Sequence, residues 1–155
     1  MKINCDGATF KEQNKLGVGV VICDENGMVL ASMAKQIPQL YTALEVEAMA
    51  ASTTLSFATQ LGFHRGILES DSLVLVSALI KNSTYLSTDG LLLDDIRFYT
   101  SFFNQLLYSH VKREGNKVAH KLAKHALCIS DFLVWMEDVP PPIRSFVQDD
   151  MDGFY

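Results

Sequence analysis

The order of the secondary-structure patterns constrains the fold of this chain more than any other feature. Three β-rich runs come first, at residues 2–8, 18–24 and 28–36. Asn26 and Gly27 separate the second run from the third, and this dipeptide tolerates the positive φ angles of a tight hairpin turn. We therefore expect three antiparallel strands at the start of the domain.

Helix and strand patterns alternate after these runs. A helix is predicted over residues 43–60, because Thr42 and Glu45 have the spacing of a capping box at its start. The later patterns predict a strand, two helices, a strand and a final helix that Asn116 can cap, at 65–70, 72–81, 91–103, 105–112 and 116–127, with a polar break at 82–89. A meander followed by βαβ units predicts an α/β fold with a mixed five-stranded sheet and helices on both faces.

The composition is that of one compact domain. The chain has 155 residues, of which 48% are apolar, and a length of this order builds a single core. Its three cysteines lack C-x-x-C spacing, which argues against a disulfide framework. The start does not have the pattern of a secretory signal, and no apolar run approaches the roughly 18 residues of a membrane span. We expect an intracellular protein with no membrane association.

The net charge of −5 excludes binding of nucleic acid through bulk electrostatics, which needs many basic residues to neutralise phosphates. Any such binding must be local. The basic residues that could provide it gather late in the chain, at Lys112, Arg113, Lys117, Lys121 and Lys124, together with His110, His120 and His125. A solvated helix face is the other explanation for this cluster.

Three carboxylates are candidate metal ligands. Asp6 lies in the first strand, Glu47 lies in the first helix beyond its cap, and Asp71 follows the fourth strand. The first and fourth strands can lie side by side in the predicted sheet, and the first helix can cross them there. Three carboxylates in one place repel one another unless a cation is present, and oxygen ligands favour Mg²⁺ or Mn²⁺ over zinc.

Each carboxylate also has an ordinary explanation when it is considered alone. Asp71 could be a helix cap, Asp6 could be a turn residue before Gly7, and Glu47 could lie on the surface. The prediction of a metal site depends on the three residues being brought together.

Five segments, spread over nearly the whole chain, carry a family resemblance. They are a D-G motif at 4–8, a glycine-containing strand at 17–21, an acidic helix at 45–48, a D-S motif at 69–72 and a segment similar to R-x-x-N-x-x-A-D-x-L-A at 111–123. With these motifs the chain resembles the ribonuclease H (RNase H) domains. Within them it looks like the retroelement-derived, reverse-transcriptase-like group of plants.

The resemblance implies an endonuclease that hydrolyses the RNA strand of RNA–DNA hybrids with two ions of Mg²⁺ or Mn²⁺. It implies that Asp6 bridges the metals, that Glu47 and Asp71 complete one of them, and that His120 is a weak ligand of the other. An RNA–DNA hybrid or another nucleic acid would be the partner. The residues implied to contact it are Gly7, Ala8, Ser72, Lys112, Arg113, Asn116, Lys117 and Lys121.

The chain departs from the family pattern at His120, where most members have a fourth carboxylate. A neutral imidazole supplies no negative charge and prefers Mn²⁺ or softer ions to Mg²⁺. The short loop at 114–115 also carries no histidine to help release product. Two alternatives therefore stay open. The domain could have lost efficient catalysis and serve as a nucleic-acid or protein interaction module, and His120 could be a surface residue.

The motifs divide the chain into an RNase H-like domain at 1–130 and a C-terminal extension at 131–155. Residues 132–140 resemble the extension of the plant group, in which a tryptophan packs back on the domain. The prolines at 140–142 could instead be a polyproline ligand. We expect the acidic end of the extension to be flexible.

Overall fold

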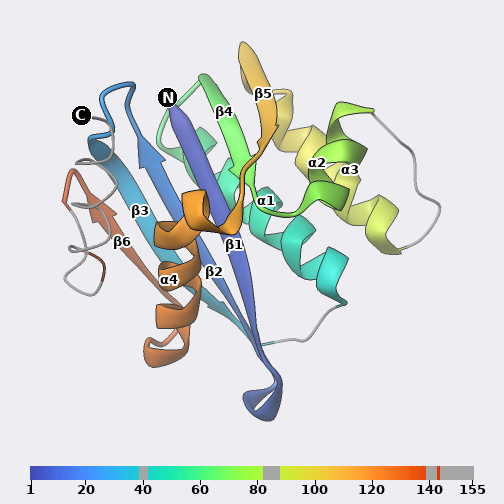
Figure 1. Ribbon diagram of the computed structural model, residues 1–155, viewed down its shortest axis with the longest axis vertical. Helices are drawn as coiled ribbons and strands as arrows, with labels where there is room; N and C mark the ends of the chain where they lie inside the picture. Colours follow the sequence, from blue (N-terminus) through green and yellow to red (C-terminus); the bar gives the residue numbers. More distant parts are fainter. Residues whose placement is uncertain (39–41, 82–87, 139–142, 144–155) are drawn as a thin grey trace.

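The computed structural model describes residues 1–38, 42–81, 88–138 and 143 (Figure 1). In this part of the chain, six strands form one mixed sheet with the order β5-β4-β1-β2-β3-β6. Strand β1 is antiparallel to β2 and parallel to β4, β4 is parallel to β5, and β3 is antiparallel to β2 and β6. The strands are β1 (Lys2–Phe10), β2 (Lys15–Cys23), β3 (Val29–Ile37), β4 (Arg65–Ser70), β5 (Gln105–His110) and β6 (Phe132–Met136).

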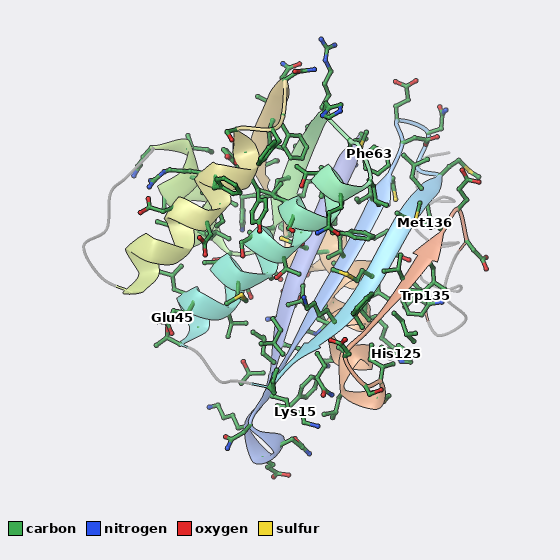
Figure 2. All side chains as sticks on the ribbon, turned by 180° about the vertical axis from the view of Figure 1, so that it is seen from behind. Lys15, Glu45, Phe63, His125, Trp135 and Met136 are labelled. Carbon is green, nitrogen blue, oxygen red and sulfur yellow. The ribbon has the colours of Figure 1, made fainter. Side chains whose placement is uncertain are left out.

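Helices cover both faces of the sheet. One face carries α1, α2 and α3, and the other carries α4, as Figures 1 and 2 show from opposite sides. The α-helices are α1 (Ala43–Gln60), α2 (Leu73–Ile80), α3 (Thr88–Thr100) and α4 (Lys117–His125). Short 3₁₀ helices are η1 (Lys11–Gln13), η2 (Arg113–Asn116) and η3 (Ala126–Cys128). The predicted α/β fold with a mixed sheet is confirmed.

Two local signals in the sequence form the structures that they predict. Gly27 has a φ of +81° in the turn between β2 and β3, a conformation that glycine adopts without strain. Asp24 closes this turn, because its Oδ1 accepts hydrogen bonds from the backbone N–H groups of Asn26 and Met28 at 2.8 and 2.9 Å. At the start of α1, Thr42 and Glu45 form the capping box.

Other expectations need correction. The sheet has a sixth strand, β6, because the segment after η3 turns at Asp131, with a φ of +67°, and pairs with β3. Asn116 precedes α4 but makes no capping hydrogen bond with its side chain. Helix α3 begins at Thr88, which lies within the predicted polar break, and residues 82–87 of that break lie outside the described residues.

The sheet separates two apolar clusters. The larger cluster lies between the sheet and α1 to α3, and its largest fully buried side chains include Ile3, Ile22 and Leu55. The smaller cluster lies between β2, β3 and α4, and includes Val21, Val118, Ala119, Leu122 and Ile143. No helix among the described residues is long and apolar enough to cross a membrane.

Helix α4 packs against β2 at two glycines. A Cβ atom on Gly19 would lie 2.0 Å from the carbonyl oxygen of Ala119, and one on Gly17 would lie 2.0 Å from that of Ala123. Any larger residue would push the helix away from the sheet. Strand β2, which contains these glycines, is the neighbour of β1 in the sheet. The close packing therefore also sets the distance between α4 and β1.

The C-terminal extension contributes β6 to the edge of the sheet beside β3. Trp135 is half-buried against the smaller cluster, and its ring centroid lies 6.4 Å from that of His125 (Figure 2). The prolines at 140–142 and the acidic end fall within 139–142 and 144–155, which lie outside the described residues. A flexible end and a polyproline ligand stay predictions.

Substitution Gly19→Ala tests the close packing of α4. The new methyl group would overlap the backbone of Ala119, so we expect a loss in the free energy of unfolding of at least about 2 kcal/mol, measured by urea denaturation. Gly115→Ala is the control, because its Cβ would meet only Val111 at an ordinary 3.8 Å. Equal stability of the two variants would contradict the packing described here.

Candidate metal-dependent active site

Asp6, Glu47 and Asp71 come together beside β1. One carboxylate oxygen from each lies within 4.8 Å of the other two. The sheet explains the meeting of the two aspartates, because β1 and β4 run parallel with Asn4 opposite Glu69, and Asp6 and Asp71 each follow two residues later. Helix α1 supplies Glu47. The predicted juxtaposition of the three carboxylates is thus present in the structure.

The ordinary explanations for the single carboxylates do not hold. Ser72, not Asp71, caps α2, since its Oγ accepts a hydrogen bond from the backbone N–H of Leu75 at 3.3 Å. Asp6 lies within β1 and is 3% exposed, so it is not a turn residue. Glu47 is no surface glutamate, because its Oε2 is buried.

The side chain of Glu47 gives the strongest evidence for a cation at this site. Its Oε2 has no hydrogen-bond partner among the described residues, and a buried carboxylate oxygen without a partner is costly. Burial, and then the charges of Asp6 and Asp71, raise the pKa of Glu47 from an ordinary 4.5 to about 8. Burial also raises the pKa of Asp6, and the charge of Asp71 adds to this effect. A divalent ion would give Oε2 of Glu47 a partner and would offset the repulsion among the three carboxylates. The residues therefore fit a metal.

His120 reaches the site from α4. Its Nδ1 lies 2.6 Å from Oδ2 of Asp6, and its side chain is 30% exposed. The two atoms share a hydrogen bond, which favours the charged form of Asp6 and opposes the rise of its pKa. His120 is therefore not a detached surface residue.

The side chain of Asn116 makes hydrogen bonds with β1 next to the site. Its Nδ2 donates to the carbonyl oxygen of Cys5 at 2.9 Å, and its Oδ1 accepts from Nδ2 of Asn4 at 3.1 Å. Asn116 is 2% exposed, so its polar atoms make their hydrogen bonds inside the protein. These bonds hold the strand in place next to Asp6. Contact of Asn116 with nucleic acid stays a prediction.

A hollow of about 670 Å³ opens beside Glu47 and Asp71. Arg113 lines it, with its Nε 3.9 Å from Oδ2 of Asp71. His110 lines it too, and its Nε2 lies 3.3 Å from the carbonyl oxygen of Asp71. The sequence placed His110 in the basic cluster but not among the metal-site residues, although the ends of the parallel strands β4 and β5 meet here. The hollow therefore has basic groups beside its carboxylates.

The other predicted nucleic-acid contacts lie on, or next to, the elements that carry the site residues. Gly7 and Ala8 continue β1 past Asp6 and are half-buried, as is Ser72. The basic residues are exposed and run from the end of β5 along η2 to α4, at Lys112, Arg113, Lys117 and Lys121. Their exposure makes them accessible to a phosphate backbone, and their role stays a prediction.

Comparison with known proteins identifies the family. The sequence pattern of the reverse transcriptase-like family matches residues 4–126. The chain belongs to this family. The matched region of this reverse transcriptase-like domain contains all four predicted site residues and ends before β6. A search of curated proteins finds none that matches.

Solved structures with the same fold include several ribonucleases H. RNase H1 from the halophilic archaeon Halobacterium salinarum is 25% identical, with a TM-score of 0.74 over 82% of this chain and 96% of that one. The N-terminal RNase H domain of Rv2228c from Mycobacterium tuberculosis is 24% identical, with a TM-score of 0.71 over 82% and 94%. LC11-RNase H1, isolated from compost and solved in complex with an RNA/DNA hybrid, is 22% identical, with a TM-score of 0.72 over 82% and 96%.

The raised pKa of Glu47 predicts how stability depends on pH without metal. A carboxyl group that holds its proton more tightly when folded stabilises the fold at low pH, and this contribution is lost as the pH rises through the folded pKa. In EDTA, the free energy of unfolding should fall between about pH 4.5 and pH 8. Glu47→Gln should remove about 1 to 3 kcal/mol of that fall.

Urea denaturation at pH 5 and pH 8 measures the effect. Glu12→Gln on η1 is the control, because Glu12 is exposed and lies outside the site. If Glu47→Gln and the wild type lose the same stability between the two pH values, Glu47 is not the strained carboxylate that its burial indicates.

Proposed function

We propose that this domain is an RNase H-type endonuclease that hydrolyses the RNA strand of RNA–DNA hybrids, with Mg²⁺ or Mn²⁺ as its cofactor. The observation that carries the proposal is the cluster of Asp6, Glu47 and Asp71, with the unpartnered Oε2 of Glu47, within a reverse transcriptase-like fold. The complex of LC11-RNase H1 with an RNA/DNA hybrid supports the choice of substrate. Fold alone does not determine activity, so the site bears the argument.

Asp6, Glu47 and Asp71 would hold the metal. When bound, divalent ions supply Lewis acidity that activates water and stabilises the charge developing on a phosphate. Asp6 has a carboxylate oxygen within 4.8 Å of one of Asp71 and lies 2.6 Å from Nδ1 of His120, so it would be the residue shared if two ions bind. His120 would either contribute a nitrogen ligand or orient Asp6 by donating from Nδ1, and both roles require its position on α4.

The protein's own basic side chains would position the hybrid. Arg113 lies beside Asp71 in the hollow, where a guanidinium group can bind a phosphate with two donors. Lys112, Lys117 and Lys121 lie along the same stretch of chain and extend the positive charge away from the carboxylates. The overall charge of −5 favours a local basic surface of this kind over binding by the whole molecule.

Asp6→Asn tests the proposed activity. The loss of the central carboxylate should abolish metal binding and hybrid cleavage, while stability in EDTA is unchanged or higher because repulsion is relieved. The measurement is Mn²⁺- and Mg²⁺-dependent cleavage of a labelled RNA–DNA hybrid, with Asp24→Asn in the β2–β3 turn as a carboxylate control outside the cluster. Full cleavage by Asp6→Asn would refute the site. Metal binding without cleavage by the wild type would favour the interaction module.

His120→Asp tests the departure from the family pattern. Wild-type cleavage should favour Mn²⁺ over Mg²⁺, since imidazole is a softer ligand than carboxylate. A carboxylate at this position should raise the Mg²⁺-dependent rate about tenfold, which corresponds to about 1.4 kcal/mol of transition-state stabilisation. His120→Asn is the neutral control and should give no increase. An unchanged rate and metal preference in His120→Asp would remove His120 from the metal site.

Salt dependence tests the proposed basic surface. Binding through about four cations should weaken roughly 100-fold between about 50 and 200 mM salt. Fluorescence anisotropy with the non-cleaving Asp6→Asn variant measures it. Lys117→Gln should reduce the salt slope by about one, whereas Lys11→Gln on η1 should not change it. Tight binding that does not depend on salt would show that another surface or another partner is involved.

A further inference from the structure

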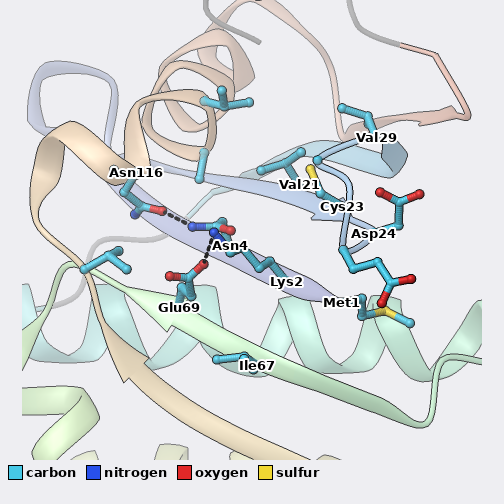
Figure 3. Close-up of a pocket in the computed structure, with 16 residues that line it drawn as sticks. Met1, Lys2, Asn4, Val21, Cys23, Asp24, Val29, Ile67, Glu69 and Asn116 are labelled. Atoms are coloured by element: carbon cyan, nitrogen blue, oxygen red, sulfur yellow. Dashed lines mark hydrogen bonds and ion pairs between the residues drawn. The ribbon is translucent and has the colours of Figure 1, made fainter. Parts of the chain in front are cut away.

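A second cavity lies on the α4 side of the sheet (Figure 3). Its volume is about 470 Å³, and it is bounded by β1, β4, the turn between β2 and β3, and the start of α4. Small-molecule sites occupy about 300 to 1,000 Å³, so this cavity has a suitable size. None of the four predicted metal-site residues lines it, whereas Asn116, a predicted nucleic-acid contact, does.

Part of the cavity lining belongs to the protein core. Val21, Val29, Val118 and Ala119 line it, and none of them is more than 9% exposed. Figure 3 shows Val21 and Val29 in this lining, and Val21 lies opposite Asn4 in the β1–β2 pairing, as Asn4 lies opposite Glu69 in the β1–β4 pairing. A compact apolar group that enters from solvent would therefore meet aliphatic side chains that are already fixed by packing.

A buried carboxylate lies on the same face of the sheet as Val21, two strands away. Glu69 on β4 is only 9% exposed. Nζ of Lys2 is 3.9 Å from Oε1 of Glu69, which is too long for a hydrogen bond. Lys2 is the side-chain partner of Glu69 within the described part of the chain, so the carboxylate retains capacity for another donor.

The charged side chains around the cavity determine whether it favours a positively or a negatively charged ligand. Its side chains include three carboxylates, from Asp24, Glu25 and Glu69, and one ammonium group, from Lys2. The excess of negative charge attracts cations and repels phosphates.

We propose that this cavity is a second binding site, which takes a small organic cation with an ammonium group on a compact apolar body. The ammonium group donates hydrogen bonds to the carboxylate of Glu69, and the apolar body packs against Val21 and Val29. Charge-assisted hydrogen bonds in a partly desolvated site are the stronger kind, which gives the ammonium group preference over a neutral group of the same shape.

A matched pair of probes tests the proposal with the whole chain at pH 8. The probes are 4-phenylbutylamine and its neutral analogue 4-phenylbutan-1-ol, and calorimetry measures their affinities. The amine should bind at least about tenfold more tightly than the alcohol. Glu69→Gln should remove that preference, and Glu12→Gln, which removes the same charge outside the cavity, should keep it.

Cysteine protection locates the bound amine without any substitution in the cavity. Cys23 lines the cavity, whereas Cys128 is exposed elsewhere. The amine should slow alkylation of Cys23 by iodoacetamide, with Cys128 as the internal control, and the alcohol at the same concentration should protect Cys23 much less. Equal binding of the two probes, no binding of either, or amine binding that leaves Cys23 unprotected would overturn the proposal.

Discussion

The close approach of two helices to β1 and β2 determines the geometry of the site. A Cβ on Gly7 would lie 2.6 Å from Cγ1 of Val46, and one on Gly19 would lie 2.0 Å from the carbonyl oxygen of Ala119. Gly7 follows Asp6 in β1, and Gly19 lies opposite Asp6 in the sheet. The helix residues next to these contacts are Glu47 and His120. Close packing at two glycines thus delivers a site residue to each side of one buried aspartate.

This arrangement stabilises the chain through packing and destabilises it through electrostatics. Asp6, Glu47 and Asp71 are held within 4.8 Å of one another by strands and a helix that cannot move apart without loss of the core. The unpartnered oxygen of Glu47 and the raised pKa values of Glu47 and Asp6 are the consequence. The fold therefore holds together negative charges that a cation would stabilise. The hydrogen bond from His120 to Asp6 offsets only part of their repulsion.

Local sequence signals predicted much of the architecture and the carboxylate cluster. The Asn26-Gly27 turn and the Thr42 capping box depend on short-range chemistry, so the sequence contains the whole signal. The meeting of Asp6 and Asp71 followed from the expectation that the first and fourth strands lie side by side, and the structure shows that they pair in parallel.

Features that depend on distant contacts were not predicted. The pairing of β6 with β3 brings together segments about 100 residues apart, and a short apolar run does not reveal its partner. Asn116 resembled a helix cap, but its hydrogen bonds join it to Asn4 and Cys5 of β1. His110 enters the site through the register of β5 with β4. The most direct test of the central claim is a crystal structure with Mn²⁺, located by its anomalous scattering. The account predicts an anomalous peak coordinated by Asp6, Glu47 and Asp71, and a peak elsewhere, or no peak at saturating Mn²⁺, would contradict it.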